Sequence, residues 1–329
     1  MSTNALLSPN YLLQLYQQGQ RSFQEAQLYR ANFKKVTLNR INFSRAELQQ
    51  SNLSQGTFIS ANFSNANLKQ ANLSKAILIE ATLTHTNLNE AILVKANLSG
   101  AILSNTNLKK ADLSHACLVG ASLVFAQLSK AILEKADLTG VSLTHAVLTQ
   151  ANLQQGILNR AILSSANLTG ANLKKASLIK AYLYRANLQE TNLQGADLRY
   201  ADLRQVNLRG ANLKGANLEG ANLGNADLTA ANLSETNLEG AELSKANLQR
   251  ANLTLANLTG CNLVNANLSE ADLSEANLSQ AGLLLTHLTG ANLKKANLNQ
   301  ANLIGAILAE TNLLTASLEE TIMPNGSRG

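Results

Sequence analysis

The stretch ANLKGANLEGANLGNADL, residues 211–228, decides the fold because it repeats one pattern of five residues without interruption. The pattern is a small residue, a polar residue, a leucine and two variable residues. The same spacing runs through residues 21–320, which form 60 consecutive pentapeptides with no insertion or deletion. The third position is Leu in 55 of them and Phe in 5, and the first is Ala in 45. Repetition of this extent indicates a repeat architecture.

A period of five fits neither an α-helix nor a flat strand. Five residues rotate by about 140° on an α-helix, so the leucines would spiral around every side. In a strand, an odd period would place successive leucines on opposite faces. The pattern fits a chain that turns a corner every five residues, with the leucine and the preceding small residue pointing inward. Four such sides would close a square coil of 20 residues.

The tandem motif A(D/N)LXX resembles the pentapeptide-repeat family. This resemblance implies an all-β fold, a right-handed quadrilateral β-helix with the Leu or Phe and the small residue inside. Sixty pentapeptides would then make about 15 coils. We expect a leader with a short capping helix in residues 1–20, the β-helix in residues 21–323 and a tail in residues 324–329. The leader segment 12–16, followed by Arg21 and Phe23, resembles cyanobacterial members.

The two ends of the repeat are expected to differ. Ser8 can cap a short helix that has Pro9 at its first position, and this helix would cover the first coil. Pro324 follows the last pentapeptides, and no second helix is expected there. The last coil would therefore be open, which suggests a homodimer formed end to end.

Composition argues against an enzyme. The chain is 4% aromatic with no Trp, and a core of Leu and Ala offers no concave site where catalytic groups could converge. Neither the histidines nor the two cysteines form a catalytic or metal-binding pattern. We therefore predict no catalytic residue, no metal and no cofactor. The sequence shows no signal-peptide pattern and no apolar run long enough to span a membrane, so we expect a cytoplasmic protein.

Outward positions carry an unusual number of apolar residues in the middle of the chain. Elsewhere these positions are mostly polar, so the apolar patch is a candidate surface for a protein partner. Because Ile and Val also favour β structure, each one taken singly has a structural explanation. The patch comprises Ile77, Ile79, Ile102, Val119, Val124, Phe125, Ile162, Ile179, Tyr182 and Tyr184.

A second candidate surface is basic. Residues spaced by twenty positions would share one corner, and many of them are lysines. Such a line could bind phosphates or an acidic surface, or it could serve solubility by keeping coils from associating sideways. This lysine ridge comprises Lys35, Lys75, Lys95, Lys135, Lys174 and Lys175.

Three functions follow from these surfaces. The first is a rigid, non-catalytic scaffold, with a regulatory role as one option, that binds a still unidentified protein partner through its outer faces. The second is binding of nucleic acid or an anionic surface through the lysine ridge, although no aromatic residues interleave it. The third comes from the resemblance: some family members mimic DNA and protect gyrase. The net charge of +6 disfavours that function, since only residues 215–329 are acidic on balance.

Overall fold

The computed structural model describes residues 7–329, so residues 1–6 of the predicted leader lie outside the described residues. The helix expected in the leader is α1, Pro9–Gln17. It begins where the sequence predicts. The Ser8 side chain accepts a hydrogen bond from the Tyr11 N–H, and Pro9 at the first helical position has no backbone N–H that would need an acceptor. Among residues 7–329 it is the only α-helix, and it is too short to cross a membrane.

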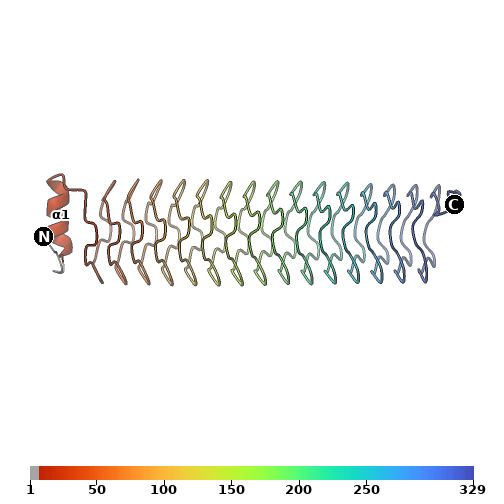
Figure 1. The fold of residues 1–329 in the computed structure, drawn as a ribbon, viewed down its shortest axis with the longest axis horizontal. Coiled ribbons are helices and arrows are strands. Elements are labelled where there is room, and N and C mark those ends of the chain that lie inside the picture. Colours follow the sequence, from red (N-terminus) through yellow and green to blue (C-terminus); the bar gives the residue numbers. More distant parts are fainter. Residues whose placement is uncertain (1–6) are drawn as a thin grey trace. The chain divides into compact units, whose positions relative to one another are not determined.

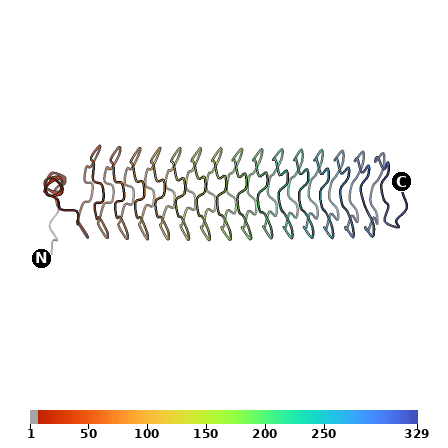
Figure 2. The same cartoon turned by 90° about the horizontal axis from the view of Figure 1, so that it is seen from above.

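The rest of the described chain forms coils joined by parallel bridges between residues twenty positions apart. The chain divides into two compact units, residues 1–162 and residues 163–329, which we describe separately. In the first unit the bridges run from Ser22↔Asn42 to Ser142↔Ile162, and in the second from Asn167↔Asn187 to Asn302↔Ile322. Each bridge involves a single residue per side, and successive coils stack in register within each unit (Figures 1 and 2). The period of twenty confirms that four pentapeptides close one coil.

A tight turn forms every corner. The residue two positions after each leucine has a positive φ, for example 57° at Lys95 and 58° at Phe125. The next N–H closes the turn by donating to the leucine carbonyl, as Ala126 does to Leu123 at 3.0 Å. A residue with positive φ at the third position is the mark of a type II turn. The variable residues at these corners point outward, so function can change there without altering the coil.

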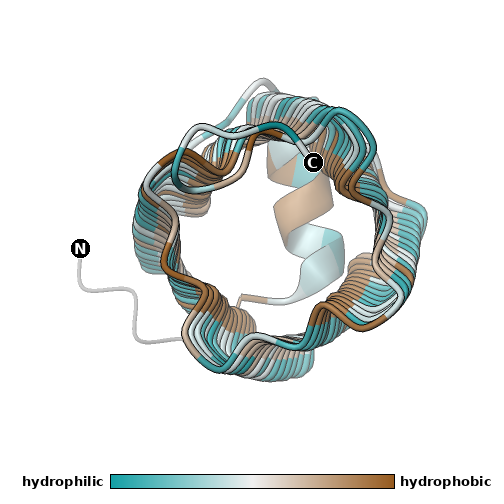
Figure 3. Ribbon diagram, turned by 90° about the vertical axis from the view of Figure 1, so that its right-hand side faces the viewer, coloured by the Kyte–Doolittle hydropathy of each residue, from teal (hydrophilic) through white to brown (hydrophobic). Residues whose placement is uncertain are grey.

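Leucine and alanine fill the inside of each unit. The inward leucines before the last coil are almost completely buried, and Figure 3 shows hydrophobic residues on the inner side of the coils. Polar residues at inward positions find partners: the Thr86 hydroxyl donates to the Phe63 carbonyl at 2.7 Å. The Cys261 thiol likewise donates to the Leu238 carbonyl at 2.8 Å. Such bonds explain why the small position tolerates Thr, Ser and Cys.

The two ends differ as expected. Figures 1 and 2 place α1 beside the first coil, where Leu12 is fully buried and the Tyr16 hydroxyl donates to the Asn39 carbonyl at 3.0 Å. At the other end the tail turns back, and Ile322 pairs with Arg328 in an antiparallel bridge. The tail therefore covers one side of the last coil. Three leucines of that coil are only half-buried: Leu308, Leu313 and Leu318.

Candidate binding surfaces

A column of glycines forms one corner of the first unit. Gly100, Gly120 and Gly140 occupy the same corner in consecutive coils, with positive φ between 64° and 65°. A side chain added at Gly120 or Gly140 would meet nothing within 4 Å, so the space above these two corners is open. The absence of side chains there lets a partner approach the backbone and touch both adjoining sides of the coil.

Six predicted apolar residues of the first unit lie near this glycine corner: four on the two sides that meet there, and Val124 and Phe125 at the next corner along the coil. Four of them are exposed, including Ile102 at 43% and Phe125 at 50%, whereas Ile79 and Val124 are half-buried. Ile162 belongs to the same side as Ile102, but Ser122 and Ser142 separate the two along the ladder. We call the set nearest the glycines the glycine-corner patch. It comprises Ile77, Ile79, Ile102, Val119, Val124 and Phe125.

Phe125 is the largest exposed apolar residue of this patch. Its ring stacks on the His145 ring of the following coil, with centroids 5.0 Å apart and planes 5° from parallel. The stacking holds the phenyl ring against the corner instead of leaving it free to rotate. A ring held in place loses less conformational entropy on binding, and this makes Phe125 a suitable anchor for a partner.

The second unit holds the other three predicted apolar residues, Ile179, Tyr182 and Tyr184. Tyr182 is exposed, and Ile179 and Tyr184 are half-buried. Two guanidinium groups lie near the Tyr184 ring, that of Arg185 at 5.0 Å and that of Arg204 at 5.7 Å from its centroid. Tyr184 therefore lies in a basic setting, whereas the charged residue closest to Gly100 of the glycine corner is Glu80.

The lysine ridge divides between the two units. In the first unit, four lysines lie in one corner column, because the backbone N–H of each corner residue donates to the carbonyl just before the corner residue of the next coil. The column comprises Lys35, Gln55, Lys75, Lys95, His115 and Lys135. Among the described residues, the only ion pair of these four lysines is between Lys135 and Glu134, at 3.6 Å. Lys174 and Lys175 belong to the second unit. The four lysines of the first unit thus present largely uncompensated charge.

Two exposed isoleucines beside the ridge were missing from the sequence prediction. Ile92 and Ile132 lie on the side that separates the ridge from the preceding corner, which carries Lys110 and Lys130. Asp112 stands between the isoleucines in the bridge ladder. Their register was readable in the sequence, since both occupy the outward position after the small residue. This side of the first unit therefore combines apolar and basic groups.

Six of the thirteen lysines and arginines of the second unit form ion pairs with carboxylates, four of the six being arginines. The Arg199 guanidinium donates to the Asp197 carboxylate at 2.7 Å, and Arg204 donates to Asp202 at 2.6 Å. These hydrogen bonds lower the pKa of Asp197 and the pKa of Asp202 below their ordinary values. Paired arginines have less charge to offer a phosphate than the free lysines of the first unit. Within residues 7–329, no group of three His, Cys, Asp or Glu side chains is arranged to hold a metal ion.

The family model described as pentapeptide repeats (8 copies) matches the chain in successive segments from residues 26–65 to residues 286–323. The chain therefore belongs to the pentapeptide-repeat family, as its motif predicted. Its four-sided coils are those expected of that family, whose members are generally structural or binding proteins. Among curated proteins none matches the chain.

Solved structures of pentapeptide-repeat proteins are similar to the chain. HetL, a protein involved in heterocyst differentiation regulation from the cyanobacterium Nostoc, is 27% identical over 98% of this chain and 100% of HetL, with a TM-score of 0.26. Rfr23 from the cyanobacterium Cyanothece is 35% identical over 35% of this chain and 85% of Rfr23, with a TM-score of 0.18. QnrB1, a plasmid-mediated fluoroquinolone resistance protein, is 20% identical over 60% of this chain and 88% of QnrB1, with a TM-score of 0.29.

Proposed function

We propose that the chain is a non-catalytic scaffold that binds a protein partner through the glycine-corner patch of its first unit. The observation that carries this proposal is the exposed apolar surface over two adjoining sides, with glycines at the corner between them. Exposed apolar side chains gathered on one part of a mostly polar surface mark candidate interaction sites on proteins. Packed leucines fix the backbone beneath it, so binding costs little ordering of the chain. We also infer about 15 coils, within the limits 21–323.

The test removes the patch without touching the core. Tagged chain with Ile102→Ser and Phe125→Ser is compared with the unaltered chain in capture from a nuclease-treated lysate, followed by mass spectrometry. The proposal expects a defined protein that the unaltered chain retains and the double variant loses. The matched control is Leu255→Ser, an equally exposed apolar residue of the second unit. Retention by the double variant, with unchanged circular dichroism, would contradict the proposal.

A second candidate function is binding of nucleic acid or an anionic surface through the lysine ridge. The unpaired lysines of the first unit support it, and so do the exposed Ile92 and Ile132 beside them. The first unit carries 14 basic and 7 acidic residues, which also argues against DNA mimicry by that unit. For either ligand the affinity should fall steeply with salt, because counterions compete with the lysines.

This candidate is tested by changing three lysines together. Lys75→Glu, Lys95→Glu and Lys135→Glu should abolish binding to duplex DNA or to vesicles containing anionic lipid. The same charge change in the second unit, Lys245→Glu, Lys294→Glu and Lys295→Glu, is the control. If both triple variants lose binding equally, net charge rather than the ridge is responsible. Binding to DNA but not to vesicles, or the reverse, identifies the ligand.

A further inference from the structure

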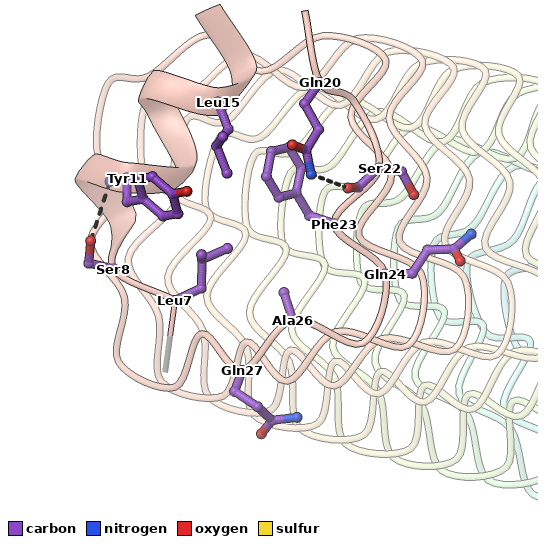
Figure 4. Close-up of a pocket in the computed structure, with 10 residues that line it drawn as sticks. All are labelled: Leu7, Ser8, Tyr11, Leu15, Gln20, Ser22, Phe23, Gln24, Ala26 and Gln27. Carbon is purple, nitrogen blue, oxygen red and sulfur yellow. Dashed lines mark hydrogen bonds between the residues drawn. The ribbon is translucent and has the colours of Figure 1, made fainter. Parts of the chain in front are cut away.

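A cavity of about 660 Å³ lies between α1 and the first coil of the first unit. Figure 4 shows that one wall comes from the helix and the segment before it, and the opposite wall from the first coil. Tyr11 and Leu15 of α1 face Phe23 and Ala26 across this space. Cavities that bind drug-sized ligands have volumes of about 300–1,000 Å³. The space is thus large enough for a molecule of one or two rings.

The cavity exists because α1 is fastened elsewhere on the coil. The Tyr16 hydroxyl holds the helix to Asn39, and the Arg21 guanidinium lies 3.9 Å from the centre of the Tyr16 ring. Arg21 also donates to the Tyr16 carbonyl at 2.7 Å. These contacts fix the C-terminal turn of α1, while the N-terminal turn stands away from Phe23. The gap between the N-terminal turn of α1 and Phe23 therefore results from the anchoring of the helix at its other end.

The lining determines which chemistry fits. None of the ten lining residues is charged, and five of them are Leu, Tyr, Phe or Ala. Two of the polar lining side chains are already engaged: Gln20 Nε2 donates to the Ser22 carbonyl at 3.1 Å, and Gln27 Nε2 donates to the Glu25 carbonyl at 3.3 Å. A charged ligand would lose water without gaining a counter-ion, which is costly. An uncharged ring loses little and can pack against the Tyr11 and Phe23 rings.

We propose that this cavity is a binding site for a small, uncharged, ring-containing apolar molecule. None of its lining residues belongs to the glycine-corner patch or to the lysine ridge. A test of this site is therefore independent of the tests of the proposed function. A ligand there would contact α1 and the first coil together. Its binding would therefore stabilise the contact between the cap and the coil.

The experiment uses the full chain and the neutral probe N-phenyl-1-naphthylamine, whose fluorescence rises in apolar surroundings. Saturable binding of one probe per chain is expected. Tyr11→Lys, which places a charge on the cavity wall at an exposed residue, should weaken the affinity at least about tenfold. The anionic analogue 1-anilinonaphthalene-8-sulfonate, with a similar ring system, should bind the unaltered chain more weakly than the neutral probe.

Two controls distinguish this site from general adsorption. Tyr29→Lys changes a similarly exposed tyrosine of the first coil that lies outside the lining, and it should leave the affinity unchanged. Leu314→Lys tests the half-open last coil, the other apolar surface at a chain end. The proposal is overturned if no saturable binding occurs, if Tyr11→Lys binds like the unaltered chain, or if Leu314→Lys abolishes binding. Thermal unfolding of each variant verifies that the coils remain folded.

Discussion

Inward leucines contribute most of the stability of each coil. Leu123 is completely buried, and coils above and below leave no freedom to close a void. Leu123→Ala should therefore lower the free energy of unfolding by about 2–5 kcal/mol, through lost burial and the cavity that remains. Urea unfolding followed by circular dichroism measures the change. Leu255→Ala, at an exposed corner, should change it by less than about 0.5 kcal/mol, and equal losses would contradict the packed core.

The two cysteines should differ sharply in reactivity. Burial raises the pKa of the Cys261 thiol to about 12 from an ordinary 9.0, whereas Cys117 is half-buried on an outward position. The thiolate is the reactive form, so Cys261 should resist a disulfide reagent at pH 8 in the folded chain while Cys117 reacts. Because the folded pKa is raised, the contribution of Cys261 to stability is complete below pH 9 and falls as the pH rises from 9 towards 12.

Mass spectrometry after timed labelling assigns each modification. Labelling of Cys261 as fast as Cys117 under native conditions would show that the second unit opens readily. Urea should remove the difference between the two residues, because both thiols are then exposed.

How far the sequence predicts a residue depends on which way its side chain points. The period of five assigns Leu123 to the interior because any other placement would expose sixty leucines and phenylalanines. The same period assigns Phe125 to the outside but not its stacking on His145, which depends on rotamers of two neighbouring coils. It also gives Ile79 and Val119 the same outward position after a leucine, although Val119 is exposed and Ile79 is half-buried. The surroundings of an outward side chain come from other coils, and a linear pattern does not contain them.

At the scale of the element, α1 protects the edge of the first coil. Its beginning was predictable from Ser8 and Pro9, but the cavity beneath it was not, because the position of the helix depends on Tyr16 reaching Asn39. Leu12 anchors the helix from its buried face. Leu12→Glu should detach α1, since a buried carboxylate would have no partner. The exposed edge should then recruit other chains.

Two measurements would detect the detachment of α1 from the first coil. Trypsin should cleave after Arg21 faster in Leu12→Glu, because Arg21 is held against Tyr16 while the helix is docked. Light scattering after gel filtration should show a larger species that grows with concentration. Gln14→Glu adds the same charge on the exposed face of α1 and should change neither. A monomeric Leu12→Glu with ordinary trypsin resistance would mean that α1 does not protect the edge.

At the scale of the whole molecule, the two ends of the repeat set how copies of the chain can associate. The first coil is covered by α1, whereas the tail covers only one side of the last described coil, where Leu308, Leu313 and Leu318 are half-buried. A contact between a covered end and an open end is blocked. A contact between two half-open last coils is isologous and closes on itself, so it gives dimers rather than filaments.

We therefore expect the chain to form a dimer through its last coil. Ile307 and Leu314 are exposed there, and the half-buried interior leucines lie beside them, so burial of apolar surface would drive association. Ile307→Lys with Leu314→Lys should shift sedimentation from dimer to monomer, while Leu255→Lys, at an exposed position away from the last coil, should not. Association driven by apolar burial should persist in high salt, whereas pairing of the basic first unit with acidic groups would weaken. A chain that sediments as a monomer at every concentration, or a dimer that survives the double substitution, would place the self-association surface elsewhere or exclude it.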